Sequence, residues 1–127
     1  MCSSDLLIVD PVRSGAGPRM SAGVRFGETI WLAGHVSDDR ALGVRGQTAA
    51  ILAKIDARLA ALGSDKTRIL MAHVWLADIA TFEEMNAAWD AWVDPGHLPA
   101  RATVEARLAS PDYLVEIAVV AAAGSAA

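Results

Sequence analysis

The sequence has few of the residues that build disulfide or metal-finger scaffolds. Its only cysteine is Cys2, so an intrachain disulfide is excluded, and its three histidines are dispersed along 127 residues. No metal-ligand spacing can be drawn from them. We therefore expect no metal and no organic cofactor.

Long hydrophobic runs and export signals are also lacking. The longest apolar stretch, residues 117–123, is about a third of a bilayer span. The first residues do not combine a basic region with an apolar run and a cleavage site. We therefore expect no membrane contact and a cytoplasmic location.

The chain has fewer basic than acidic residues. Fifteen acidic residues against eleven Lys and Arg give a formal net charge of −4, which argues against a nucleic-acid partner and against ribonuclease activity. Gly15 and Gly17 neither follow a strand nor open a helix, so they form no phosphate-binding loop. A Ser/His/Asp triad cannot be argued from the sequence either.

Apolar residues, in contrast, are abundant. They make up 54% of the chain, against 20% charged residues, which is more than an ordinary soluble monomer of this length needs. The length fits a single domain. Part of its surface is therefore expected to face a partner.

Residue periodicity divides residues 20–122 into seven elements, after an irregular segment at 1–19 and before a tail at 123–127. Extended runs at 21–26 and 28–33 flank Gly27 and predict a hairpin. Apolar residues at helical spacing predict one helix from Gly46 to a left-handed cap at Gly63, and another over 81–93 with a capping box at Thr81. The apolar run 68–76 predicts a central strand covered on both faces, and strands at 101–108 and 113–120 follow.

This order, β-β-α-β-α-β-β, predicts an α+β fold with two helices packed on one face of a mixed sheet. Two helices cannot cover both faces of the sheet. Apolar residues on the second face are therefore expected to be buried against neighbouring subunits.

Two charged residues in the last strands are candidates for chemistry. Arg101 begins a strand whose alternation puts it on a polar face with Thr103, Glu105 and Arg107. It is either a surface arginine, which composition alone favours, or a guanidinium that takes a substrate carboxylate in two hydrogen bonds. Glu116 lies in a strongly apolar strand, so it is either half of a structural ion pair or a catalytic acid/base at a polar cavity.

Four further residues have polar side chains at informative positions. Asn86 interrupts the apolar stripe of the second helix, where a structural hydrogen bond is favoured over a site role. His35 follows Gly34 between a strand and a turn, a position typical of site residues. His73 is expected to be a satisfied core histidine, and His97 to face solvent.

Six short motifs in the second half of the chain together resemble one known family. They are GSDK at 63–66, VWLAD at 74–78, MN at 85–86 with WDAWV at 89–93, PAR at 99–101, VEA at 104–106 and VEI at 115–117. Each motif is weak alone and the set is specific. The chain resembles the Rid family, also called YjgF/YER057c/UK114, and within it the YoaB-like branch, over roughly residues 20 to 122.

The resemblance implies a chorismate-mutase-like fold, a homotrimer, and a cleft between each pair of adjacent subunits. Well-studied members are enamine/imine deaminases that hydrolyse reactive 2-iminoacids to 2-oxoacids and ammonia. Arg101 matches the family arginine that grips the substrate carboxylate, and Glu116 the glutamate that positions the attacking water. Asn86 matches an asparagine near the site, and Gly34 a glycine that lines it.

Three positions depart from the typical deaminase site. The family tyrosine falls at Met20, its serine at Ala33, and its cysteine near the arginine at Thr103. Carboxylate binding is therefore better supported than the deaminase substrate range. A trimer that only binds small carboxylates, or one that acts as a chaperone, is the alternative.

Overall fold

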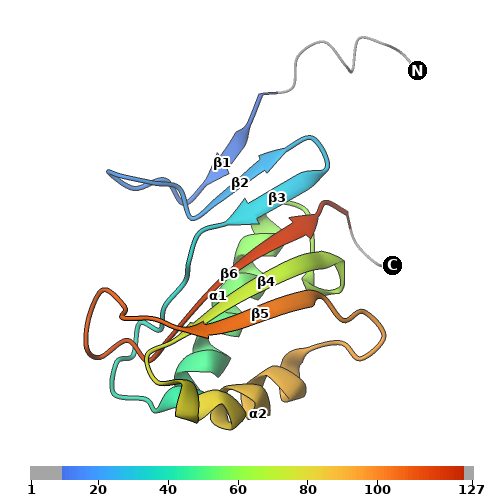
Figure 1. Ribbon diagram of the computed structural model, residues 1–127. Coiled ribbons are helices and arrows are strands. Elements are labelled where there is room, and N and C mark those ends of the chain that lie inside the picture. The colour runs from blue at the N-terminus through green and yellow to red at the C-terminus, as the bar shows by residue number, and fades with distance from the viewer. Residues whose placement is uncertain (1–9, 125–127) are drawn as a thin grey trace.

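The computed structural model describes residues 10–124, which form one mixed sheet backed by two α-helices (Figure 1). The strands are β1 (Val12–Ser14), β2 (Gly23–Phe26), β3 (Thr29–Leu32), β4 (Ile69–Leu76), β5 (Ala100–Glu105) and β6 (Val115–Ala122). The helices are α1 (Val44–Ala61) and α2 (Phe82–Trp92), with short 3-10 turns η2 (Lys66–Arg68) and η3 (Ile79–Thr81). The predicted α+β architecture is confirmed.

The order of the strands in the sheet is β1-β2-β3-β6-β4-β5. Every neighbouring pair is antiparallel except β4 and β5, which are parallel and joined through α2. The hairpin of β2 and β3 turns at Gly27, whose φ of 61° suits glycine. The last strand in sequence therefore lies in the middle of the sheet.

Both helices pack on the same face of the sheet (Figure 1). Helix α1 buries Ile51, Ile55 and Leu59 at helical spacing against the core. It ends at Ala61, and Gly63 adopts the expected left-handed conformation with φ of 85°. Alternate residues of β4 and β6, such as Val74 and Ile117, complete this core from the sheet.

The opposite face of the sheet has no helix over it. Trp75 of β4 pairs with Glu116 of β6 on this face, and Trp31 and Val104 are 45% and 51% exposed there. His73 also lies on this face, exposed and stacked on the ring of Trp75, so its prediction as a core histidine was wrong. The reason is the strand alternation: the core takes Ala72 and Val74 of β4 and leaves His73 outside.

Several predicted boundaries differ from the structure. Part of the segment expected to be irregular forms β1, because Val12–Ser14 continues the sheet beyond β2. Thr81 gives no side-chain cap to α2, since its hydroxyl donates to the carbonyl of Asp78, the residue directly before η3. Strand β5 ends at Glu105, before the predicted residue 108. Ala123, expected in the tail, is buried in the core.

Residues 1–9 and 125–127, which include Cys2 and most of the predicted tail, lie outside the described part of the chain. Over the described residues, neither helix is long and apolar enough to cross a membrane.

Candidate functional site

Glu116 lies directly against the backbone of Gly34. A Cβ atom added at Gly34 would come within 2.0 Å of Glu116 Oε2 and 2.9 Å of its Cδ. The contact arises because β6 pairs with the end of the β3 segment, where His35 and Ile117 exchange backbone hydrogen bonds. Only glycine therefore leaves room for the Glu116 carboxylate in this position.

The Glu116 carboxylate has no hydrogen-bond or ion-pair partner among residues 10–124. It is half-buried at a hollow on the helix-free face, lined also by Trp75 and by residues 106–109. Arg107 lines the same hollow without forming an ion pair with Glu116. Glu116 thus forms no structural ion pair within the described residues 10–124.

Arg101 lies on the other face of the sheet, between β5 and helix α2. Its guanidinium carbon is 5.0 Å from the centroid of the Trp89 ring and 5.6 Å from that of Phe82. Nη1 lies 3.7 Å from the sulfur of Met85, a weak acceptor. The register against β4 puts Arg101, Thr103 and Glu105 on one face of β5, as the alternation predicts, while Arg107 lies beyond the end of the strand.

The two aromatic rings position the Arg101 guanidinium but provide no counterion for its positive charge. Partial burial lowers the pKa of the guanidinium from its usual value, while Asp90 and Glu83 act in the opposite direction. Neither carboxylate is within ion-pair distance, and no oxygen in the described chain accepts from Arg101. The fork of N–H donors is held by stacking and stays available to a planar anion.

Asn86 and Thr103 lie on the same side of the sheet as Arg101. Asn86 lines a cleft of about 370 Å³ with Arg101, Trp89 and Asp90. Its amide makes no hydrogen bond to residues 10–124, so the expected structural crosslink is not found there. The Thr103 hydroxyl is buried without a hydrogen-bond partner in the described chain.

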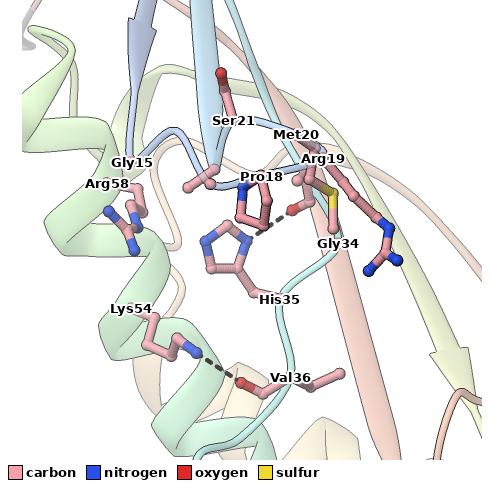
Figure 2. Close-up of a pocket in the computed structure, with 13 residues that line it drawn as sticks. Gly15, Pro18, Arg19, Met20, Ser21, Gly34, His35, Val36, Lys54 and Arg58 are labelled. Carbon is pink, nitrogen blue, oxygen red and sulfur yellow. Dashed lines mark hydrogen bonds between the residues drawn. The ribbon is translucent and has the colours of Figure 1, made fainter.

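A second cavity, of about 380 Å³, contains four of the predicted site residues (Figure 2). Met20, Ala33, Gly34 and His35 line it, together with the loop from Gly15 to Ser21 and the side chains of Lys54 and Arg58 from α1. Met20 is 70% exposed. The cavity lies near the edge of the sheet made by β1 and β2, remote from β5.

His35 is 6% exposed and forms part of this cavity wall. Its Nδ1 is 2.7 Å from the Ala33 carbonyl, to which it donates as the neutral tautomer. Burial lowers the pKa of His35, and the positive charges of Lys54 and Arg58 lower it further. The Ala33 carbonyl and Asp38 act against that shift without reversing it.

The predicted site residues thus form two separate groups in one chain. Met20, Ala33, Gly34 and His35 line one cavity, with Glu116 on the far side of Gly34. Arg101, Asn86 and Thr103 lie at β5 and α2, and strands β6 and β4 separate the two groups. No cluster of three or more metal-ligating side chains occurs within residues 10–124.

Sequence reasoning missed Lys54 and Arg58 as cavity residues. The helical spacing of the apolar residues singles out only the buried stripe that contains Ile51 and Ile55, and both residues lie beside it. Their spacing of one helical turn was the available signal, since it puts both on one flank of the helix. The loop that closes the cavity over that flank has no sequence pattern that predicts its path.

Comparisons with known proteins agree with this fold. The family model described as Endoribonuclease L-PSP matches residues 13–123. The RutC family protein YoaB of Escherichia coli is 47% identical over 111 residues, which are 87% of this chain and 96% of that protein. A RutC family protein of Haemophilus ducreyi is 45% identical over 104 residues, covering 82% and 89%.

Solved structures give the same result. The crystal structure of a YjgF family member from Neisseria meningitidis has a TM-score of 0.85 and 45% identity, covering 90% of this chain and 95% of that one. The chain therefore belongs to the YjgF/RutC family, also called the Rid family, and within it to the YoaB-like branch.

Proposed function

We propose that this protein is an enamine/imine deaminase that hydrolyses 2-iminoacids to 2-oxoacids and ammonia, in clefts between the subunits of a homotrimer. The observation that carries the proposal is the pair of unneutralised groups at the family positions. Arg101 offers its N–H donors without an oxygen acceptor, and Glu116 is an unpaired carboxylate, both within residues 10–124.

The position of these groups on opposite faces of the sheet supports a site shared between subunits. A small substrate cannot touch Arg101 and Glu116 of one chain, because the sheet separates them. Arg101 of one copy can meet Glu116 and Gly34 of the next when two copies pack together. The apolar face around Trp31 and Val104 gives such packing a driving force.

In this mechanism Arg101 takes the substrate carboxylate in two parallel hydrogen bonds and so fixes the imine carbon. Glu116 accepts a proton from water as the oxygen adds to the carbon of the protonated imine, and the C=N π electrons move to nitrogen, which gives a carbinolamine. Glu116 then gives that proton to the amine nitrogen, the C–N bond breaks, and the carbinolamine hydroxyl loses its proton to Glu116 as the C=O bond forms. One water is consumed, and a 2-oxoacid and ammonia are released.

Few catalytic groups suffice for this reaction because imines already hydrolyse in water. Each tenfold acceleration needs the barrier to fall by only about 1.4 kcal/mol. Alignment by Arg101 and proton transfer through Glu116 supply contributions of that kind. Met20 and Ala33 lack the hydroxyl groups of the typical site, and Thr103 has a hydroxyl in place of its thiol, so these positions affect which side chains the substrate carries more than the central step.

The test is ammonia release from a 2-iminoacid that an amino-acid oxidase generates in the same solution. We expect the wild-type protein to accelerate release above the spontaneous rate and Arg101→Met to abolish the acceleration. Arg13→Met, which removes an arginine from edge strand β1, is the matched control and should keep it. Carboxylate binding without accelerated release would instead support the non-catalytic binding or chaperone-like trimer.

RNA cleavage, named in the family description, is not supported by the charge of this chain. A net charge of −4 gives no general attraction for a phosphate backbone. The cytoplasmic location expected from the sequence stays a prediction.

A further inference from the structure

The hollow beside the Glu116 carboxylate is also lined by an arginine that the proposed mechanism does not use. Arg107 forms part of its wall, together with Trp75, and the hollow has a volume of about 240 Å³. The Arg107 guanidinium makes no hydrogen bond or ion pair with residues 10–124. A cation that has no counterion in the described chain therefore lies near the proposed general base.

The backbone after β5 brings Arg107 to this hollow. The Ala106 N–H donates to the Leu76 carbonyl at 2.9 Å, so the chain stays beside the end of β4 for one residue beyond β5. Residues 106–114 then form the loop that leads to β6 (Figure 1). Since Glu116 is the second residue of β6, both ends of the loop contribute to the same hollow.

The nearest carboxylates along the chain do not neutralise Arg107. Glu105 lies on the helix-covered face of β5, and its Oε2 accepts from the Ile79 N–H at 3.1 Å. Glu116 shares the hollow with Arg107 but is outside ion-pair distance. Arg107 is therefore available to an anion that enters the hollow.

The need for such an anion increases when the helix-free face is covered. Arg107 is exposed in the single chain, where water solvates its charge. In the proposed trimer a second copy covers this face and brings its own Arg101 toward Glu116. A guanidinium that loses water in this way requires an anionic partner. Since the substrate enters the same cleft, it can provide that partner.

The charges of the assembled site match those of one class of substrate. The protonated imine is positive and lies at Glu116, and the 1-carboxylate lies on Arg101. A second carboxylate, on the substrate side chain, gives Arg107 a partner of the same kind. Each charge of a dicarboxylic 2-iminoacid is then opposite one charge of the site, whereas a monocarboxylic substrate leaves Arg107 unpaired.

We propose that the deaminase site prefers 2-iminoacids with an acidic side chain, and that Arg107 binds the side-chain carboxylate. This inference rests on the proposed function, because it assigns a substrate class to the same site. The small residues Ala106 and Ala109 and the ring of Trp75 form much of the remaining wall. A hollow of this size and lining fits a short side chain that ends in a carboxylate.

Titration calorimetry with two oxoacids of equal chain length tests the proposal without turnover. 2-Oxoglutarate and 2-oxopentanoate both resemble the reaction product, and only 2-oxoglutarate has a second carboxylate. We expect the wild-type protein to bind 2-oxoglutarate about tenfold or more tightly, because a charge-assisted fork is added. The kcat/KM values for ammonia release from the two corresponding 2-iminoacids should differ in the same direction.

Variants assign each carboxylate to its arginine. Arg107→Met should remove the preference for 2-oxoglutarate and change the 2-oxopentanoate affinity by less than about twofold, since it removes only the second fork. Arg107→Lys should keep part of the preference, because it keeps the charge without the planar fork. Arg101→Met should weaken the binding of both oxoacids. Arg45→Met removes an exposed arginine outside the hollow and should bind both as the wild-type protein does.

Three results would overturn the proposal. One is equal affinity for the two oxoacids, or binding of neither, in the wild-type protein. Another is an undiminished preference in Arg107→Met. The third is loss of the preference in Arg58→Met alone, which would assign the second carboxylate to the cavity under the loop at residues 15–21. Ammonia release is measured separately: release without the preference contradicts only this inference, and the preference without release contradicts only the deaminase proposal.

Discussion

The contact between Gly34 and Glu116 is the tightest one at the candidate site. Gly34 does not adopt a left-handed conformation, so alanine is compatible with its backbone. The atom that an added methyl group would meet first is the end of the flexible Glu116 side chain. A methyl group here displaces the carboxylate, and the backbone can stay in place.

We therefore expect Gly34→Ala to lower the rate of ammonia release by about tenfold or more, because a displaced general base loses most of its effect. Thermal unfolding should change little. Gly43→Ala, at a position where an added Cβ meets no atom within 4 Å, should keep the rate. An unchanged rate in Gly34→Ala would show that the carboxylate position is not important for turnover.

His35 gives a prediction for the pH dependence of stability. Its pKa in the folded protein is below the ordinary value of about 6.5, because of burial and the charges of Lys54 and Arg58. The unfolded chain therefore binds more protons between the two pKa values. The stabilisation that neutral His35 gives the folded protein is complete above about pH 6.5. It is lost as the pH falls through the folded-state pKa.

Unfolding by urea at several pH values should accordingly show a smaller acid loss for His35→Gln than for the wild-type protein. Asp38 faces the same region and raises the pKa of His35. The Asp38→Asn variant should therefore lose more stability in acid than the wild-type protein does. Identical pH profiles for wild type and His35→Gln would contradict this role of the imidazole.

At the scale of the elements, one buried amide joins the start of α1 to the segment before β6. Gln47 is fully buried, and its Nε2 donates to the carbonyls of Leu42 and Asp112 at 3.0 and 2.9 Å. Its Oε1 accepts from the Leu114 N–H at 2.9 Å. This residue therefore fixes the backbone at Leu114, directly before β6 and two residues before Glu116.

Gln47→Leu should lower the free energy of unfolding by roughly 2–4 kcal/mol, since it leaves buried backbone groups without partners. Chemical denaturation measures the change. Arg45→Leu, an exposed substitution in the same helix, is the control and should cost less than about 0.5 kcal/mol. Equal stability of the two variants would show that the backbone groups that Gln47 bonds in the wild-type protein find water as a partner in Gln47→Leu.

The elements with strong periodicity could be predicted from the sequence. The α1 stripe of Ile51, Ile55 and Leu59 and the turn at Gly27 follow from side-chain spacing and backbone preference. Strand β1 could not be predicted, because three residues are too few to show an alternation of apolar and polar side chains. Its backbone is extended because it pairs with β2. The Thr81 capping box failed because η3 placed that hydroxyl on Asp78.

The candidate site was only partly predictable for the same reason. The identities of Arg101 and Glu116 followed from motifs, but the face on which Arg101 lies depends on the register of β5 against β4. Alternation within one strand cannot choose which of its faces meets α2. Lys54 and Arg58 became cavity residues through a loop whose path is set by tertiary contacts.

At the scale of the whole molecule, the helix-free face leads to a prediction about assembly. We expect a stable trimer, so light scattering at micromolar concentration should give three times the chain mass of 13.3 kDa. Val104→Arg puts a charge on the exposed apolar face and should shift the mass downward and reduce ammonia release together. A monomer mass for the wild-type protein would remove the trimer and the shared site.

The most direct test of the deaminase account separates turnover from binding at Glu116. Glu116→Gln keeps the size of the side chain and removes the proton acceptor, while Arg101 is untouched. Ammonia release should fall by roughly 100-fold or more, and 2-oxoacid affinity should stay within about a few-fold of the wild-type value. A variant that keeps the full rate and loses only thermal stability would show that Glu116 is structural, and would contradict the mechanism.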